Sequence, residues 1–159
     1  LMVKILFVCL GNICRSPTAH GVFDALLKHE GLDNQIHVDS AGTAAWHAGN
    51  SPDARSQLAA KDRGVDLSYI TARQVEGSDF ESFDYILAMD KANLNDLKAQ
   101  ADSIQQNKIM LFLSFAQSSD TTEVPDPYYG GAKGFDTVLD LVEDACVGLL
   151  DDIKQKYLS

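Results

Sequence analysis

The stretch Ile5-Leu6-Phe7-Val8-Cys9-Leu10-Gly11-Asn12-Ile13-Cys14-Arg15-Ser16-Pro17 combines an apolar run, a polar loop and the start of a helix. The run from Ile5 to Val8 is continuous rather than alternating, which is typical of a parallel strand covered on both faces. Ser16 and Pro17 are expected to be the N-cap and first residue of a helix over residues 17–29. The stretch therefore predicts a strand, a loop and a helix at the start of an α/β fold.

The same alternation continues along the chain. Apolar runs predict strands at 36–39, 85–89 and 109–113, and helical periodicity predicts helices at 53–63, at 92–101 and from 132 or 135 to 157. The small residues Ser40 to Thr43 predict a loop after the second strand. We therefore expect a single open three-layer α/β domain over residues 2–159, in which helices flank a four-stranded parallel sheet and ligands bind beyond the carboxyl ends of the strands. Leu1, ahead of Met2, is interpreted as a remnant of cloning.

Composition and charge exclude several classes of partner. Lys and Arg total 13 against 23 Asp and Glu, which gives a formal net charge of -10. Such an acidic surface repels phosphate backbones and anionic lipid, so we expect neither nucleic acid nor a membrane as a partner. The three cysteines, an odd number in a chain with no recognisable leader, favour reduced thiols and a cytoplasmic location. The four histidines share no ligand spacing, and we expect no metal or other cofactor.

The loop after the first strand carries the groups that an anion site needs. Its backbone amides can converge on an anion at the helix N-terminus, and Gly11 and Asn12 tolerate the positive φ angles of such a loop. Arg15 offers a planar fork of donors that fits two phosphate oxygens. In the same positive field, Cys9 is expected as the nucleophilic thiolate, and Ser16 could donate its hydroxyl to the sulfur. The nucleotide-binding Gly-Lys-Ser/Thr signature and the dinucleotide glycine fingerprint are both missing.

A second segment, Val124-Pro125-Asp126-Pro127-Tyr128-Tyr129-Gly130-Gly131, places one acid beside two aromatic rings. A thiolate that attacks a phosphate monoester expels an alkoxide or phenoxide, and this leaving group needs a proton. Asp126 could protonate the leaving oxygen and then activate water, while Tyr128 and Tyr129 flank a flat aromatic substrate. An ordinary Asp-Pro turn with packed tyrosines is the competing interpretation.

The two segments resemble those of the low molecular weight protein tyrosine phosphatase family, whose phosphate loop is Cys-x5-Arg-Ser/Thr and whose acid lies in an Asp-Pro-Tyr/Phe loop. Intermediate matches extend the resemblance over essentially the whole chain; they are Asp39-Ser40-Ala41-Gly42-Thr43, Ala72-Arg73-Gln74 and the segment from Phe83 to Asp90. The resemblance implies a flavodoxin-like strand order, 2-1-3-4. It also implies hydrolysis of phosphotyrosine and small aryl phosphates through a phosphocysteine, with acid phosphatase activity and inorganic phosphate as a product.

The resemblance also implies a role for each site residue. Cys9 is the nucleophile, Arg15 binds phosphate and the transition state, and Asp126 is the acid and then the base. The expected substrate-binding residues are Leu10, Gly11, Asn12, Ile13, Cys14, Ser16, Trp46, Tyr128 and Tyr129. Asn12 and Ser40 would brace the loop, and Cys14 could form a reversible disulfide with Cys9 under oxidation. The implied partners are proteins that contain phosphotyrosine, including a cognate tyrosine kinase.

Three other functions remain open on the same scaffold. An arsenate reductase needs a relay of further cysteines, and none occurs between Cys14 and Cys146. Protein-arginine phosphatases favour a smaller, polar Thr where this chain has Ile13, whose apolar side chain better suits an aromatic ring. A non-catalytic phosphotyrosine-binding module could use the same anion pocket, but the presence of both Cys9 and Asp126 argues against it.

Overall fold

Four parallel strands form the centre of the protein in a computed structural model that describes residues 2–158. They are β1 (Val3–Cys9), β2 (Ile36–Gly42), β3 (Tyr85–Ala88) and β4 (Ile109–Leu111). All three pairings are parallel, and the order across the sheet is β2-β1-β3-β4. The expected order 2-1-3-4 is therefore confirmed. Leu1, which we interpret as a remnant of cloning, lies outside the described residues.

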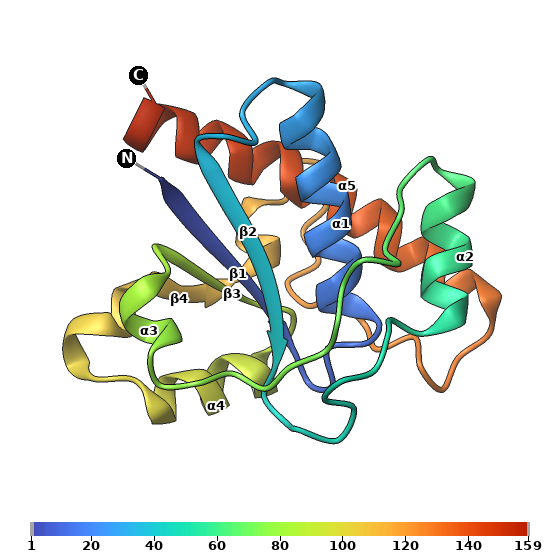
Figure 1. Ribbon diagram of the computed structural model, residues 1–159, viewed down its shortest axis with the longest axis horizontal. Coiled ribbons are helices and arrows are strands. Elements are labelled where there is room, and N and C mark those ends of the chain that lie inside the picture. The colour runs from blue at the N-terminus through green and yellow to red at the C-terminus, as the bar shows by residue number, and fades with distance from the viewer. Residues whose placement is uncertain (1, 159) are drawn as a thin grey trace.

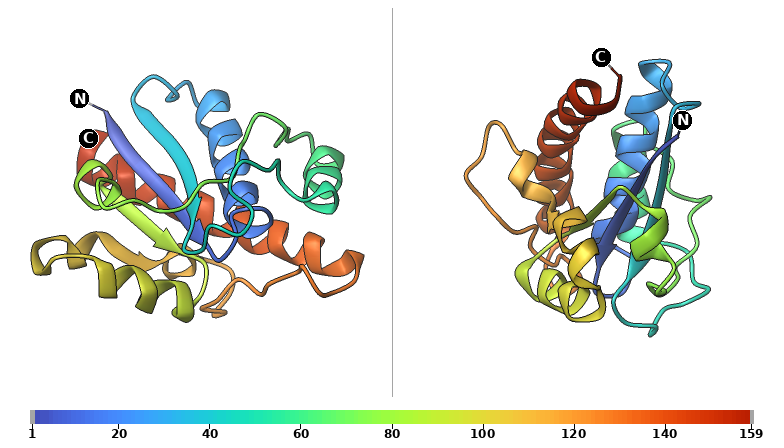
Figure 2. Two further views of the ribbon diagram at one scale, coloured as in Figure 1. Left: turned by 60° about the horizontal axis from the view of Figure 1, so that its bottom comes forward. Right: turned by 90° about the vertical axis from the view of Figure 1, so that its left-hand side faces the viewer.

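Helices cover both faces of this sheet (Figures 1 and 2). The α-helices are α1 (Arg15–His29), α2 (Ala54–Asp62), α3 (Asp79–Ser82), α4 (Lys91–Gln100) and α5 (Ala132–Ile153). Short 3-10 helices follow at Ser103–Lys108 and Phe112–Phe115, and a π-helical turn at Lys154–Leu158. Successive side chains of β1 point to opposite faces. Ile5 and Phe7 join the core under α1 and α5, whereas Leu6 and Val8 join a second core with residues of α3 and α4.

The start of α1 differs from the prediction. The helix begins at Arg15 with Cys14 as its N-cap, so the assignment of Ser16 as N-cap and Pro17 as first helical residue is wrong. The hydroxyl of Ser16 does not cap the helix because it lies against Cys9 and Asn12 instead. The helix therefore starts inside the polar loop, and the backbone amides of its first turn border the same space as Cys9.

Other element boundaries also move. Residues 40–42, expected in a loop, continue β2 because they pair with Phe7, Val8 and Cys9 of β1. β4 ends at Leu111, and residues 112 and 113, expected as strand, begin a 3-10 helix over Phe112–Phe115. The short helix α3 and the 3-10 helix at Ser103–Lys108 lie where no regular element was predicted.

The strand order places a crevice at the carboxyl end of β1. From β1 the chain crosses through α1 to β2 on one side, and it later returns to β3 on the other side. Loops on the two sides of such a switch point lead away from each other, which opens a binding site between them. Residues 9–14 occupy this position.

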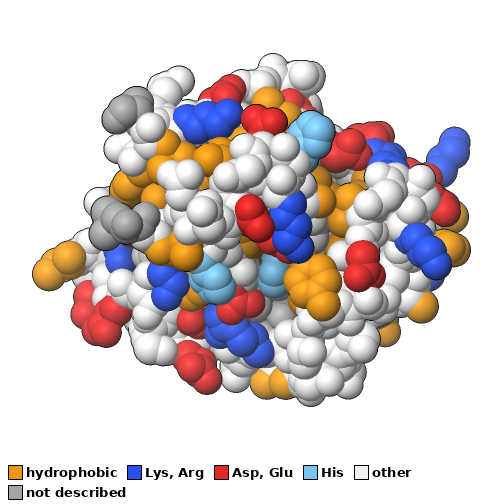
Figure 3. Space-filling view, turned by 45° about the horizontal axis from the view of Figure 1, so that its top comes forward, with side chains coloured by type: hydrophobic (Ala, Val, Ile, Leu, Met, Phe, Trp, Pro, Cys, Tyr) orange, Lys and Arg blue, Asp and Glu red, His pale blue; other side chains and the backbone are white. Residues whose placement is uncertain are grey.

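The face drawn in Figure 3 shows no broad patch of a single charge. Acidic and basic side chains are intermixed there, despite the net charge of -10. Within residues 2–158, no helix is long and apolar enough to cross a membrane.

Candidate active site

The loop from Cys9 to Cys14 turns sharply between β1 and α1. Asn12 has a φ of 56° and is the one non-glycine residue with positive φ among residues 2–158. Asn tolerates this left-handed conformation better than most residues. Gly11, which would tolerate positive φ, does not adopt it; a Cβ at Gly11 would instead lie 2.9 Å from the ring of His47. A Cβ at Gly42 would lie 2.8 Å from the carbonyl oxygen of Leu10, so β2 can run this close to the loop only with glycine there.

The Asn12 side chain holds the loop from two sides. Its amide nitrogen donates to Oγ of Ser16 at 2.7 Å, and its Oδ1 accepts from the backbone N–H of Arg73 at 3.1 Å. The Arg73 guanidinium is itself held by the carboxylates of Asp39 and Asp79. The role of Asn12 as a brace of the loop stays a prediction, and these bonds are the contacts through which it would act. Arg73 is a further residue at the loop that the sequence did not single out.

The Cys9 sulfur receives two hydrogen-bond donors. The backbone N–H of Asn12 lies 3.3 Å from Sγ, and Oγ of Ser16 lies 3.1 Å from it. The Asn12 amide donates to the Ser16 oxygen, so the Ser16 proton has two acceptors left: the sulfur at 3.1 Å and the Ala41 carbonyl oxygen at 3.4 Å. The sulfur is the nearer of the two, and a thiolate cannot itself donate. Both donors stabilise negative charge on sulfur, which is the nucleophilic form of a cysteine.

Arg15 is buried beneath the same space, with 4% of its side chain exposed. Its Nη1 donates to Oδ2 of Asp90 at 2.6 Å and to the Val124 carbonyl at 3.1 Å. Burial alone would lower the pKa of Arg15, but the negative charges of Cys9, Asp90 and Asp126 outweigh burial and raise this pKa above its ordinary value. The guanidinium therefore stays charged and is fixed in direction.

Asp90 has two roles. Its Oδ2 accepts from Arg15, while its Oδ1 accepts from the backbone N–H of Asn93 and caps α4. One carboxylate thus joins the residue after β3 to Arg15 at the start of α1. A single short side chain can do both because β3 lies directly beside β1 in the sheet.

Residues 124–131, which we call the acid segment after Asp126, reach this site from the C-terminal part of the chain. Val124 is buried, and its N–H donates to the carbonyl of Met89 at 2.8 Å. Two residues later, Oδ2 of Asp126 lies 3.8 Å from Nη2 of Arg15, while its Oδ1 accepts from the Tyr128 N–H at 3.0 Å. The Asp126 side chain is 39% exposed, so the carboxylate faces the open pocket rather than the core.

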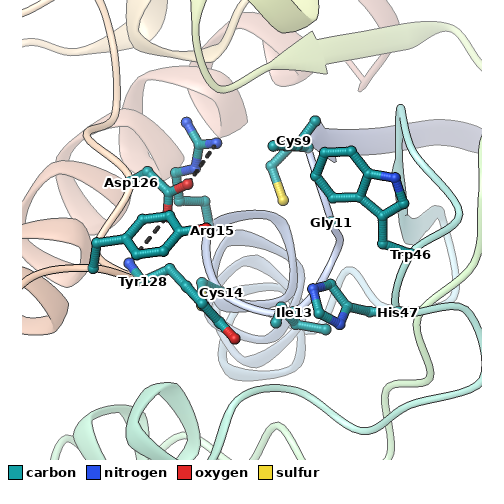
Figure 4. Close-up of a pocket in the computed structure, with 11 residues that line it drawn as sticks. Cys9, Gly11, Ile13, Cys14, Arg15, Trp46, His47, Asp126 and Tyr128 are labelled. Carbon is teal, nitrogen blue, oxygen red and sulfur yellow. Dashed lines mark hydrogen bonds and ion pairs between the residues drawn. The ribbon is translucent and has the colours of Figure 1, made fainter.

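These residues surround a cavity of about 250 Å³, shown in Figure 4. The Cys9 sulfur points into it, with Arg15 and Asp126 on one side and Trp46 and His47 on the other. The lining consists of Cys9, Leu10, Gly11, Ile13, Cys14, Arg15, Trp46, His47, Asp126, Tyr128 and Tyr129. Of the residues expected to bind substrate, Asn12 and Ser16 do not line the cavity; they lie buried behind Cys9.

Aromatic rings form the rim. Trp46 is 73% exposed, and Tyr129 is 91% exposed. The Tyr128 ring lies 4.9 Å from that of Tyr129 and 6.3 Å from that of His47, measured between ring centroids. His47 was not predicted in the site because its position next to Trp46 is its sole sequence signal. Rings at the mouth and charged groups at the base suit a flat aromatic ligand that carries an anion.

Ser40 lies one step away from the loop that it was expected to brace. Its hydroxyl oxygen lies 2.9 Å from Nδ1 of His20 on α1, so the contact joins β2 to α1. Burial lowers the pKa of His20 below its ordinary value of 6.5. The charge of His37 acts in the same direction, whereas the negative charges of Asp39 and Asp24 oppose it. Any support that Ser40 gives to the loop therefore passes through α1 and β2.

The three cysteines are all free and buried. Burial raises the pKa of Cys14 to about 12, although a contact with Ser56 lowers it in part. Burial also raises the pKa of Cys146 well above its ordinary value. A disulfide between Cys9 and Cys14 stays a prediction.

Comparisons with known proteins agree on one family. The family model described as low molecular weight phosphotyrosine protein phosphatase matches residues 4–158. The low molecular weight protein-tyrosine-phosphatase YfkJ of Bacillus subtilis is 42% identical over 99% of this chain and 100% of that protein. A low molecular weight phosphotyrosine protein phosphatase of Gallus gallus is 43% identical over 93% of this chain and 94% of its own. A crystal structure of a protein tyrosine phosphatase from Entamoeba histolytica superposes with a TM-score of 0.94 at 43% identity, covering 96% of this chain and 97% of that one.

Proposed function

The chain belongs to the low molecular weight phosphotyrosine protein phosphatase family, and we propose that Cys9, Arg15 and Asp126 carry out its hydrolytic reaction. The protein is accordingly a phosphoric monoester hydrolase that acts on phosphotyrosine through a phosphocysteine. What remains to be assigned is which side chain performs each step.

In the binding step, a phosphate group enters the loop between Cys9 and Arg15. Backbone amides at the start of α1 and the fixed guanidinium of Arg15 neutralise its charge. The contact between Arg15 and Asp126 orients both groups toward the same space, where the leaving oxygen would lie. The aromatic ring of the substrate then lies between Trp46 and Tyr128 at the rim.

In the first chemical step, the Cys9 thiolate attacks phosphorus. The S–P bond forms as the P–O bond to the tyrosyl oxygen breaks, and Asp126 gives its proton to that oxygen. The Ser16 hydroxyl stabilises the thiolate before attack. Arg15 and the loop amides stabilise the charge on the phosphoryl oxygens in the transition state.

In the second step, Asp126 acts as a base. The carboxylate formed in the first step takes a proton from water, whose oxygen attacks phosphorus and breaks the S–P bond. Inorganic phosphate leaves, Cys9 is again a thiolate, and Asp126 is again protonated. The partial exposure of Asp126 supports this role because water can reach the carboxylate.

The observation that carries the proposal is the convergence of three distant chemical groups on one cavity. Cys9 and Arg15 come from the loop after β1, and Asp126 comes from the segment before α5. Packing alone gives no reason for a buried cation, two buried hydrogen-bond donors on sulfur and an exposed acid to meet beneath a ring of aromatic side chains.

The setting of the activity is part of the proposal. We propose that residues 2–159 act as one phosphatase domain in the cytoplasm and that a cognate tyrosine kinase is among its phosphoprotein substrates. Ile13 favours phosphotyrosine over phosphoarginine because its apolar side chain lines the cavity where the substrate ring would lie.

A steady-state assay on a panel of substrates tests this function. Peptides with phosphotyrosine, phosphoserine or phosphoarginine are compared for the wild-type chain and for Cys9→Ser. We expect phosphotyrosine to give the highest kcat/KM and Cys9→Ser to abolish its hydrolysis. Faster turnover of phosphoarginine would assign a different substrate class, and activity retained by Cys9→Ser would exclude the proposed nucleophile. Binding of phosphotyrosine with no turnover by the wild-type chain would leave only a binding module.

A further inference from the structure

Arg55 stands at the start of α2, in a geometry that fixes its guanidinium. Asp53, the N-cap of this helix, accepts from the Arg55 backbone N–H and Nε through Oδ1, at 2.8 and 3.0 Å. Its Oδ2 accepts from Arg55 Nη2 at 2.9 Å. A side chain held by a bidentate pair to its own helix cap has lost much of its freedom, so it points in one direction.

That direction is toward the acid segment. The Arg55 Cζ lies 5.3 Å from the centroid of the Tyr128 ring and 4.8 Å from that of Phe135 in the first turn of α5. Both distances are within the range in which a cation is attracted to an aromatic face. Figure 1 shows α2 beside the first turns of α5 and the segment that leads into it. One guanidinium therefore contacts both the acid segment and the helix that follows.

The other side of this contact leads to the phosphate loop. The backbone N–H of Asp53 donates to the carbonyl of Ile13 at 2.8 Å. Asp53 thus holds Arg55 with its carboxylate and the phosphate loop with its backbone. The chain of contacts runs from Ile13 through Asp53 and Arg55 to the Tyr128 ring, and the Tyr128 N–H donates to the Asp126 carboxylate.

The tip of the acid segment has mainly local bonds of its own. The Tyr128 N–H donates to Asp126, and the Gly130 N–H donates to the carbonyl of Pro127. The Tyr129 side chain is 91% exposed. A contact from outside the segment therefore has a large influence on where the Asp126 carboxylate lies.

We propose that Arg55 is a positioning residue that holds the acid segment against the phosphate loop and thereby sets the reach of Asp126 to the leaving oxygen. The inference rests on the proposed role of Asp126 as the acid. Arg55 touches no reacting atom, since it acts through the ring of Tyr128. Its loss would reduce proton donation while leaving the Cys9, Ser16 and Arg15 contacts in place.

The choice of substrate separates this role from a general loss of structure. Phenyl phosphate has a strongly basic leaving group that needs a proton, whereas para-nitrophenyl phosphate has a weakly basic one that needs it far less. Loss of folded protein, or of ring contact with Tyr128, lowers kcat/KM for both substrates alike. The ratio of the two kcat/KM values therefore reports on proton donation alone.

Asp126→Asn provides the reference. We expect it to lower kcat/KM for phenyl phosphate by about 10²-fold or more, and that for para-nitrophenyl phosphate far less. Arg55→Ala should change the ratio in the same direction, by about tenfold. Arg55→Lys keeps the cation but loses the bidentate pair with Asp53, so its kcat/KM ratio should lie between those of Arg55→Ala and the wild type. This variant also keeps the test valid if the alanine variant does not fold. An unchanged ratio in Asp126→Asn would overturn the role of Asp126 as the acid. If the ratio changes in Asp126→Asn but stays at the wild-type value in both Arg55 variants, only the role of Arg55 is overturned.

A double variant tests whether Arg55 acts through Asp126. In the Asp126→Asn background, Arg55→Ala should leave the ratio where Asp126→Asn alone puts it, because no acid remains to be positioned. A further tenfold change there would contradict the inference. Arg63→Ala is the matched control: Arg63 also links α2 to α5, through Asp136, Asp140 and Glu143, and we expect its loss to leave the ratio as in the wild type.

Discussion

The Ser16 hydroxyl oxygen lies 3.1 Å from the Cys9 sulfur, and both side chains are buried at the junction of β1 and α1. Ser16 reaches the sulfur because α1 begins one residue earlier, at Arg15. The Asn12 amide donates to this oxygen, and the sulfur is a nearer acceptor for its proton than the Ala41 carbonyl oxygen at 3.4 Å. The helix start, the loop and the nucleophile are therefore parts of one hydrogen-bonded arrangement.

Ser16→Ala removes one donor from the sulfur. The Cys9 thiolate then has one hydrogen-bond donor fewer, so we expect its alkylation by iodoacetate to slow by about three- to tenfold. Peptide mass spectrometry follows the reaction. Thr18→Ala is the control, because the Thr18 hydroxyl donates to the Cys14 carbonyl on the same helix and does not contact the sulfur. Equal slowing in both variants, or none in Ser16→Ala, would contradict this role.

Asn12 combines a left-handed backbone with two side-chain hydrogen bonds. Asn12→Ala and Asn12→Gly both lose these bonds and leave the N–H of Arg73 without its acceptor, but glycine adopts positive φ without strain. We expect both variants to be less stable than the wild type, with alanine lower than glycine by about 1 kcal/mol. Urea unfolding measures the difference. A glycine variant no more stable than the alanine variant would show that the backbone conformation is not the constraint.

His20 predicts a specific dependence of stability on pH. Since burial lowers its folded-state pKa below 6.5, the unfolded chain binds more protons than the folded chain between the two pKa values. Its contribution is present above pH 6.5 and is lost as the pH falls from that value toward the folded-state pKa. His20→Gln should reduce this loss of unfolding free energy between about pH 7.5 and 5.5, whereas His29→Gln, at an exposed position on α1, should not. Identical pH profiles for wild type and His20→Gln would refute the prediction.

Cys14 should react with alkylating reagents much more slowly than Cys9. Burial raises the pKa of Cys14 to about 12, so its thiol is neutral near pH 7. We expect iodoacetate to label Cys9 first and to leave Cys14 and Cys146 largely unlabelled in the folded protein, while all three react after unfolding. Inorganic phosphate should protect Cys9. Labelling of Cys14 ahead of Cys9 would contradict the assignment of Cys9 as the reactive thiol.

Local patterns were sufficient to predict the four parallel strands and to indicate the three proposed catalytic residues, whereas the strand order came from the family resemblance. The apolar run before Cys9 and the Gly, Asn and Arg after it lie within a few residues of one another, so strand, loop and helix could be inferred together. Asp126 could be inferred because proline residues flank it and the proposed mechanism needs an acid. Both signals are carried by neighbours in sequence.

The supporting contacts could not be predicted in the same way because they join distant elements. Arg15 meets Asp90 only through the pairing of β1 with β3, and Arg55 meets Tyr128 only through the packing of α2 against α5. The start of α1 was misplaced because Ser16-Pro17 has the local signature of a helix start, whereas the tertiary contact with Cys9 takes the Ser16 hydroxyl. Tertiary bonds of this kind leave no periodicity in the sequence.

Cys9 is expected to carry the phosphoryl group between the two chemical steps, and rapid quenching of a slow variant can trap this intermediate. Asp126→Ala lacks the base for the second step, so para-nitrophenyl phosphate should load it and the phosphoenzyme should persist long enough to be quenched and digested. We predict one added phosphoryl group on the peptide that contains Cys9. When Cys9→Ser is combined with Asp126→Ala, the corresponding peptide should carry no phosphoryl group. A phosphoryl group on any other residue, retained when Cys9 is replaced, would exclude Cys9 as the nucleophile.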